Sequence, residues 1–181
     1  MGVPIPPSSK ASQDERYARV AAAFGPALER LARASEANPE QRRDLLQEIH
    51  LALWRSFARF DDRCSERTWM YRVAHNVAAS HARRARTGKL LTLDELETVA
   101  DPGQPDPELQ VAERHAVARL TALVRTLAAP DRQIVLLYLE GLEARAIGEI
   151  CGLSAGAVAT KLSRLKAVLV QRINQGGPDD R

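Results

Sequence analysis

Four side chains between positions 69 and 83 have the chemistry to bind single-stranded nucleic acid. Trp69, Arg72, Asn76 and Arg83 are separated by three, four and seven residues, so a helix would place them on one face. An indole stacks on an unpaired base, an amide hydrogen-bonds to a base edge, and guanidinium groups hold phosphates. The competing interpretation buries Trp69 in a core and leaves the arginines in solvent, and periodicity alone favours this second interpretation.

A second candidate surface lies in LEARAIGEICGLSAGAVATKLSRLKAVL, residues 142–169, which has the parts of a helix-turn-helix. Gly148 would let two helices approach, Gly152 suits a turn with positive φ, and Ser154 would cap the second helix. Leu153 is expected to fill the core. Early residues of such a second helix reach base edges in the major groove, and later basic ones reach phosphates. The alternative is a helical hairpin with solvated charges, but the turn chemistry favours DNA binding.

Motifs for catalysis, cofactors or metals do not emerge from the sequence. It contains no glycine-rich phosphate loop, nucleophile motif or paired carboxylates. The histidines lack ligand spacing; they are His50, His75, His81 and His115. Cys64 and Cys151 are interpreted as ordinary thiols in preference to a redox role for Cys64. We therefore expect a protein that is not an enzyme and has no cofactor, metal or small-molecule substrate.

Composition favours a helical protein inside the cell. The chain has 181 residues, enough for one sizeable or two small domains, and 45% of them are hydrophobic. Alanine, leucine and arginine dominate, and runs of β-branched residues are missing. The N-terminus lacks a signal-peptide core, and no run approaches the roughly 20 apolar residues of a membrane span. The expectation is a cytoplasmic protein without membrane insertion.

Charge divides the chain into two basic blocks and an acidic segment. Residues 1–86 contain 15 Lys and Arg against 10 Asp and Glu, whereas residues 87–110 contain one against six. Residues 111–181 contain 10 against seven. This pattern predicts two modules joined by a linker. The predicted parts are a disordered tail (1–13), a first module (14–86), an acidic flexible linker (87–108), a second module (109–174) and a tail (175–181).

Apolar spacing predicts that helices carry both surfaces. In the first module we expect one helix from residue 14 with a kink or break at Gly25-Pro26. A second should begin after the cap Asn38 and end near residue 57, and a third should run from about 66 to 86. Trp54 is expected in the core. In the second module the predicted helices begin near residues 109, 130, 142 and 155, with Tyr138 pointing inward.

Three blocks of the chain resemble bacterial sigma factors. They are DLLQEIHLALWRSFARFD, RTWMYRVAHNVAASHARR, and PDRQIVLLYLEGL followed by AIGEICGLSAGAV and KLSRLK. The resemblance is to the short extracytoplasmic-function (ECF) class, which keeps only the second and fourth conserved regions, and it covers about residues 15–86 and 109–173. It implies an all-α fold of two small helical domains that gives RNA polymerase its promoter specificity.

The resemblance also implies three binding surfaces. Docking on the polymerase's largest subunit would use Asp44, Leu45, Gln47, Glu48 and Leu51. Capture of the melted minus-ten element would use Asp61, Arg63, Arg67, Trp69, Arg72, Asn76, Arg83 and Arg84. The minus-thirty-five element would be read by Ser154, Ala155, Ala157, Thr160, Lys161, Arg164 and Lys166. The second-largest subunit and an anti-sigma factor would be further partners, and the acidic linker would follow the path of the exiting RNA.

Several positions depart from the family pattern. Glu66 stands where an apolar residue is usual, His75 where arginine is frequent, and His50 where phenylalanine is usual. Ala159 replaces a commonly basic residue in the recognition helix.

Two other functions are compatible with parts of the sequence. A stand-alone helix-turn-helix regulator, with the first module sensing a ligand or dimerising, would bind a duplex operator without polymerase. A helical adaptor for protein partners would have no salt-dependent affinity for DNA. The paired occurrence of the DLLQEI helix and the W-x-x-R-x-x-x-N face argues against both.

Overall fold

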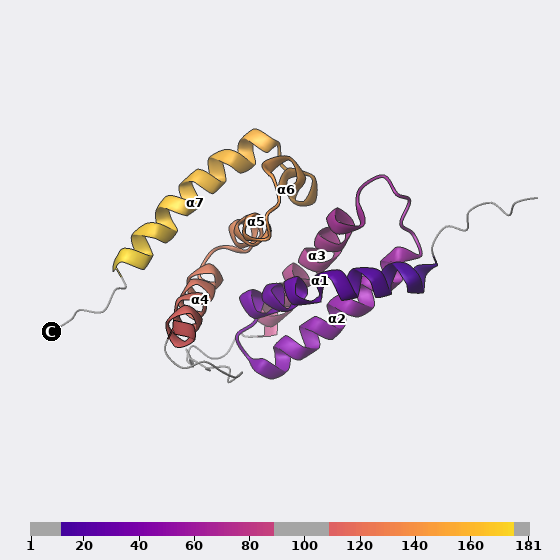
Figure 1. Cartoon of the computed structure of the whole chain (residues 1–181), viewed down its shortest axis with the longest axis horizontal. Coiled ribbons are helices and arrows are strands. Elements are labelled where there is room, and N and C mark those ends of the chain that lie inside the picture. Colours follow the sequence, from indigo (N-terminus) through magenta and orange to yellow (C-terminus); the bar gives the residue numbers. More distant parts are fainter. Residues whose placement is uncertain (1–11, 89–108, 176–181) are drawn as a thin grey trace, which may run out of the picture.

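The computed structural model describes residues 12–88 and 109–175, which form seven α-helices and no strand (Figure 1). The helices are α1 (Gln13–Ser35), α2 (Pro39–Phe57), α3 (Glu66–Gly88), α4 (Leu109–Arg125), α5 (Ala129–Leu139), α6 (Ala144–Cys151) and α7 (Ala155–Gln175). The all-α prediction is confirmed. The predictions for the N-terminal tail and most of the acidic linker lie outside the described residues. Within the described ranges, no helix has the length and apolarity needed to cross a membrane.

Helices α1 to α3 form the N-terminal module, and local signals begin two of them. Ser12 and Glu15 form a reciprocal capping box at the start of α1. The Asn38 side chain accepts hydrogen bonds from the backbone N–H groups of Glu40 and Gln41, and Pro39 occupies the first turn of α2. The predicted start of α2 is therefore confirmed.

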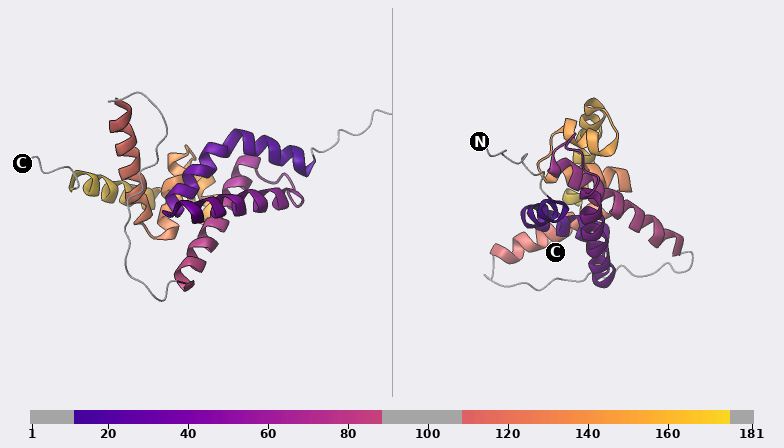
Figure 2. Two further views of the ribbon diagram at one scale, coloured as in Figure 1. Left: turned by 90° about the horizontal axis from the view of Figure 1, so that it is seen from below. Right: turned by 90° about the vertical axis from the view of Figure 1, so that its right-hand side faces the viewer.

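Of the kink or break expected at Gly25-Pro26 of α1, the break does not occur. The helix continues through Gly25-Pro26, and the left view of Figure 2 shows its ribbon bending rather than ending. A proline inside a helix removes one backbone hydrogen bond, which is compatible with a bend. The helix persists because residues on both sides of the proline, including Val20 and Leu28, are buried in the module's core.

Helices α4 to α7 form the C-terminal module, with a helix-turn-helix between α6 and α7. Gly152 ends α6 at φ 72°, a left-handed conformation that costs little only for glycine. The Ser154 side chain accepts a hydrogen bond from the backbone N–H of Ala157 at 3.2 Å, as the sequence predicted. Leu153 does not fill the core, since its side chain is 37% exposed. Its backbone makes the close contact instead, because its carbonyl lies against Gly148 of α6.

That close contact makes Gly148 sensitive to substitution. A Cβ atom at Gly148 would lie 2.4 Å from the Leu153 carbonyl oxygen, so Gly148→Ala must displace backbone. We expect the free energy of unfolding to fall by about 1–3 kcal/mol. Gly156→Ala is the matched control, because a Cβ at Gly156 meets nothing within 4 Å. Urea denaturation should show Gly156→Ala to be neutral or stabilising, and equal losses in both variants would contradict the close-approach explanation.

The two modules pack against each other. Helices α1 and α3 contact α4, α5 and α6, and Figure 1 shows α5 and α6 beside α3. At the end of α1, Arg125 donates to the Arg33 carbonyl at 2.8 Å and Arg132 donates to the Ala34 carbonyl at 3.3 Å. These carbonyls belong to the last turn of α1, and the C=O groups of a last turn have no hydrogen-bond donors within their own helix. The C-terminal module thus caps a helix of the N-terminal module.

Candidate nucleic-acid interface

Helix α7 presents the outer face predicted to read DNA. Six of the seven predicted residues are exposed, namely Ser154, Ala155, Ala157, Thr160, Arg164 and Lys166, and Lys161 is half-buried. Val158, Leu162 and Leu165 pack the opposite face into the module. The small side chains early in α7 leave its N-terminal turns free of bulk, a shape that suits entry into a major groove.

Helix α5 holds two of the cations on α7. The Lys161 ammonium lies 2.9 Å from a carboxylate oxygen of Asp131. The Lys166 ammonium donates to the Tyr138 hydroxyl at 2.8 Å and lies 4.0 Å from the centre of that ring. The prediction that Tyr138 points inward is wrong, since it is 41% exposed and reaches toward Lys166. Arg164 is exposed between these two tethered lysines.

Trp69 packs on the N-terminal module. Its ring is partly buried and lies 5.4 Å, centre to centre, from the ring of Phe60. Its indole N–H donates to the Ser56 hydroxyl at 2.9 Å. These contacts favour the structural role that periodicity indicated, and a role for Trp69 in binding DNA stays a prediction. Asn76, two turns further along the same face, is exposed and free to meet a base edge.

The arginines of the α3 face have different surroundings. Arg67 donates to the Glu140 carbonyl at 2.6 Å, and Arg72 donates to the Glu149 carbonyl at 3.1 Å. Both are therefore turned toward the C-terminal module. Near the other end of α3, Arg83 and Arg84 are exposed. Of the four residues whose spacing predicted a shared face, Arg72 lies against α6, and Arg67, which the resemblance added, lies against the end of α5.

The loop before α3 is anchored by α1. Asp61 pairs with Arg63, whose side chain is 87% exposed. Glu66, the first residue of α3, accepts hydrogen bonds from Arg16 and Arg19 of α1. The hydrogen bond from Arg19 is the largest cause that lowers the pKa of the Glu66 carboxyl. The carboxylate at Glu66 thus fastens the start of α3 to α1, and Arg16 also donates to Asp62 of the loop at 2.8 Å.

Helix α2 exposes a face that suits a protein partner. Asp44, Gln47, Glu48 and Leu51 are exposed on it, and Leu51 is 47% exposed although it is apolar. The prediction that Leu45 also lies on the docking surface is wrong, because Leu45 is fully buried in the core. Adjacent helix positions point about 100° apart, which separates Leu45 from Asp44.

Trp54 extends this exposed face, and the prediction that it is core is wrong. It is 40% exposed, and its indole N–H donates to Asp14 at 2.7 Å. Sequence reasoning missed it because the apolar stripe of α2 continues through Leu53, its immediate neighbour. The available signal was that Trp54 lies one position away from the buried stripe Leu45, Ile49, Leu53 and Phe57.

His75 is the most strongly perturbed base among the described residues. It is 5% exposed, and burial lowers its pKa to about 4. Its ring lies 6.3 Å from that of Tyr71, whose pKa is raised to about 12, chiefly by burial. A neutral histidine thus occupies a position where arginine is frequent in the family. The face of α3 that contains His75 is structural.

The buried histidine makes stability depend on pH. His75 has a pKa of about 4 in the folded chain, and about 6.5 is usual for an unfolded one. Between these values the unfolded chain binds more protons, so folding stability falls as pH falls. From about pH 7 to about pH 5, His75 should cost about 2 kcal/mol. Urea titrations of wild type and His75→Gln should differ by this amount in their pH dependence, and parallel pH profiles would contradict the assignment.

The cysteines are not among the residues of the proposed surfaces and are free thiols. Cys64 and Cys151 are half-buried, and burial raises the pKa of the Cys151 thiol to about 11, which keeps it protonated. No group of three or more His, Cys, Asp or Glu is arranged to hold a metal ion within residues 12–88 and 109–175.

Two family models match the chain. The model of Sigma-70 region 2 matches residues 20–87, and that of Sigma-70 region 4 matches residues 118–169. The first lies almost wholly in α1 to α3 and the second in α4 to α7.

Curated relatives agree with these matches. The ECF RNA polymerase sigma factor SigF of Caulobacter vibrioides is 30% identical over 136 residues, which are 73% of this chain and 70% of SigF. The RNA polymerase sigma factor CnrH of Cupriavidus metallidurans is 28% identical over 88% of this chain and 87% of CnrH. A probable sigma factor of Xanthomonas campestris, RfaY, is 28% identical, but the chain spans only 43% of its length.

Solved structures share the whole architecture. CnrH, in complex with the cytosolic domain of CnrY, matches with a TM-score of 0.67 at 20% identity, covering 92% of each chain. The sigma factor RpoE of Bartonella quintana, in complex with the anti-sigma factor NepR, matches with a TM-score of 0.69 at 18% identity, covering 94% of this chain and all of RpoE. With region 2 and region 4 in order, the chain belongs to the extracytoplasmic-function family of RNA polymerase sigma factors.

Proposed function

We propose that this chain binds RNA polymerase core and directs it to promoters with an upstream and a downstream element, and that it helps to open the downstream DNA. The observation that carries the proposal is that region 2 and region 4 occupy the two helical modules in the order that sigma factors require. The role is regulatory, and catalysis belongs to the polymerase.

The upstream element is read by α7. Ala157 and Thr160 lie early on its exposed face and would approach base edges, while Arg164 lies a turn later and would reach a base or a phosphate. Lys161 and Lys166 are held by α5 and would act as positioned phosphate contacts. This division assigns sequence reading to the first turns of α7 and affinity to its cations.

The downstream element is captured by α3 and the loop before it. Asn76 and Arg63 are exposed, Arg83 supplies positive charge along the strand's path, and Arg84, which pairs with Glu48 of α2, is a further cation there. Trp69 and Phe60 form the packed platform beside them. An exposed amide with flanking cations suits an unpaired strand, whose base edges are not engaged in pairing.

The polymerase docks on the exposed face of α2. Leu51 and Trp54 supply apolar area, and Asp44, Gln47 and Glu48 surround it with polar groups. An apolar centre with a polar rim is the usual anatomy of a protein interface. An anti-sigma factor is a further partner, and the complexes of CnrH with the cytosolic domain of CnrY and of RpoE with NepR support this. The proposed site of action is the cytoplasm.

The proposal is tested by selecting promoters from a random duplex library with the chain and polymerase core. Sequencing of the retained DNA should reveal two motifs at a fixed spacing that are enriched only when chain and core are both present. A single duplex motif enriched equally without core would instead identify a stand-alone helix-turn-helix regulator. No enrichment in either case would contradict both functions.

A further inference from the structure

The first turn of α1 lies against the end of the proposed docking face. The Trp54 indole N–H donates to a carboxylate oxygen of Asp14 at 2.7 Å. One residue earlier in α1, the Gln13 side-chain amide donates to the Trp54 carbonyl at 2.7 Å. Three residues after Asp14, the Tyr17 hydroxyl lies 3.1 Å from Nδ1 of His50. The docking face of α2 is therefore bordered by α1 and fastened to it.

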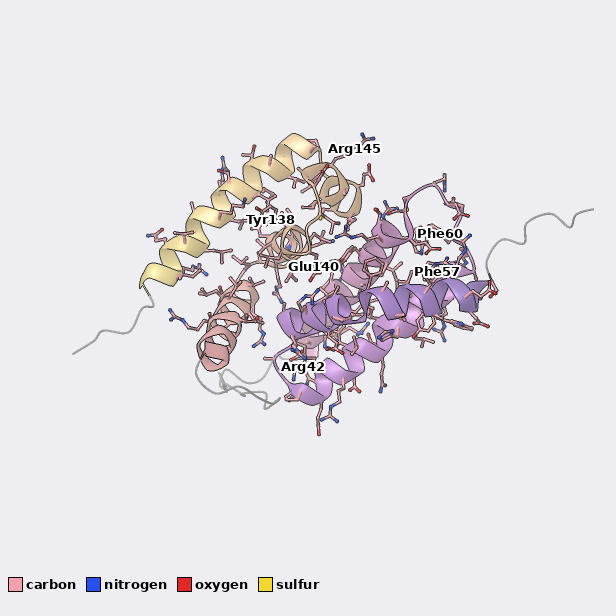
Figure 3. All side chains as sticks on the ribbon, in the orientation of Figure 1. Arg42, Phe57, Phe60, Tyr138, Glu140 and Arg145 are labelled. Carbon is pink, nitrogen blue, oxygen red and sulfur yellow. The ribbon has the colours of Figure 1, made fainter. Side chains whose placement is uncertain are left out.

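The start of α1 is itself held in place. Ser12 and Glu15 form the reciprocal capping box that begins the helix. In the same turn, the guanidinium carbon of Arg16 lies 5.1 Å from the centre of the Phe60 ring. Figure 3 labels Phe57 and Phe60, which lie beside the first turns of α1. Asp14 thus presents its carboxylate from a fixed helix start rather than from a loose chain end.

Trp54 is the largest side chain of the docking face. It is 40% exposed, and Leu51, which is 47% exposed, lies three residues earlier on the same side of α2. Tryptophan is among the residues that most often carry the binding energy of a protein interface. A side chain that is already held in its bound orientation loses less freedom when the partner arrives.

The hydrogen bond between Trp54 and Asp14 is exposed to solvent. Water competes for both groups at such a position, so the bond contributes little to folding stability. Its main consequence is geometric, because it restricts rotation of the indole ring while leaving part of the ring open to solvent. This is the arrangement expected of a contact that prepares a surface for a partner.

We propose that Asp14 is a positioning residue for polymerase docking, which holds the Trp54 ring in the orientation that the polymerase contacts. The proposal rests on the proposed function of the exposed face of α2 as the docking surface. Asp14 acts through the indole N–H and needs no contact of its own with the polymerase. The docking surface is then a product of two helices, since α1 fixes a side chain that α2 supplies.

The test titrates labelled full-length variants with purified polymerase core. Asp14→Ala should weaken binding about threefold to tenfold, because the freed ring must be ordered when the core binds. Asp14→Asn is the matched control, since it removes the same charge but keeps a carbonyl oxygen that accepts from the indole. Its affinity should stay within about twofold of wild type. Equal losses in the two variants would overturn the proposal in favour of a charge effect.

A double-mutant cycle with Trp54→Phe separates positioning from a structural role. Phenylalanine keeps an aromatic ring but has no N–H, so Asp14→Ala should cause no further loss of core affinity in the Trp54→Phe background. A role of Asp14 confined to the start of α1 predicts the same fold-loss in both backgrounds. That result would overturn the proposal, as would wild-type affinity in Asp14→Ala alone.

Fluorescence of the free chain measures the restraint itself. The chain has two tryptophans, so Trp69→Phe leaves Trp54 as the single emitter. Time-resolved anisotropy should show more local motion of Trp54 on the nanosecond timescale in Asp14→Ala and none added in Asp14→Asn. Unchanged motion in Asp14→Ala would overturn the proposal while the wild-type chain still binds core. A wild-type chain that fails to bind core would overturn the proposed function, and this role of Asp14 with it.

Discussion

Arg164→Glu is expected to abolish most promoter-dependent binding through the upstream element. Arg164 is an exposed cation on the outer face of α7, between two lysines that contact side chains of α5. Loss of a single base or phosphate contact costs about 1–3 kcal/mol, which is about 5-fold to 150-fold in affinity, and reversal of charge adds repulsion. Fluorescence anisotropy of the complex with polymerase core on a selected promoter would measure the loss.

Arg33→Glu is the matched control for this charge reversal. Arg33 lies on α1, where it pairs with Glu29, and outside the proposed DNA surfaces. Arg33→Glu changes the net charge by the same amount as Arg164→Glu, so it measures any non-specific electrostatic effect on DNA binding. Equal losses in the two variants would show that α7 has no particular part in binding.

Leu51→Asp is expected to weaken binding to polymerase core by about 30-fold, the effect of losing an interface residue worth about 2 kcal/mol. Leu51 is 47% exposed on α2, so the free chain should keep its stability. A new carboxylate at the apolar centre of the docking face would have to be desolvated on binding, without a partner. Titration of labelled chain with core would give both affinities.

Val117→Asp separates docking from a general effect of adding charge. Val117 is 64% exposed on α4, which has no proposed contact with the polymerase's largest subunit. The affinity of the Val117→Asp variant for polymerase core should match that of wild type within a factor of about two. If Leu51→Asp bound core as well as Val117→Asp does, the docking face assigned to α2 would be wrong.

Local rules predicted the parts of the fold that depend on neighbouring residues. Asn38-Pro39 specifies a helix start, and Gly148, Gly152 and Ser154 specify a close turn, because each acts through its own backbone or the next few residues. These local signals are sufficient to predict the helix-turn-helix from the sequence. The resemblance then extended the prediction to both modules.

Predictions failed where a side chain's surroundings come from distant segments. Tyr138 reaches outward because Lys166, 28 residues away, donates to its hydroxyl. Trp54 is held at the surface by Asp14, 40 residues earlier. The spacing of apolar residues predicts burial, but it does not predict a hydrogen-bond partner that comes from another helix.

The contact between the modules was the least predictable feature. Arg30 and Glu140 are 110 residues apart, and neither belongs to a motif or to an apolar stripe. Their pairing arises only when α1 and α5 meet, so nothing in either segment alone could indicate it. For the same reason, the spacing that groups Arg72 with Trp69 and Asn76 gave no sign that another module lies against Arg72.

Run-off transcription with purified polymerase core tests the central claim most directly. On a promoter obtained by selection, core plus the chain should yield a transcript of defined length, and core alone should yield none. Arg164→Glu and Leu51→Asp should each reduce that transcript, while Arg33→Glu and Val117→Asp should leave it near the wild-type amount. A transcript of equal amount with and without the chain, or none on any selected template, would contradict its assignment as a promoter-specificity factor.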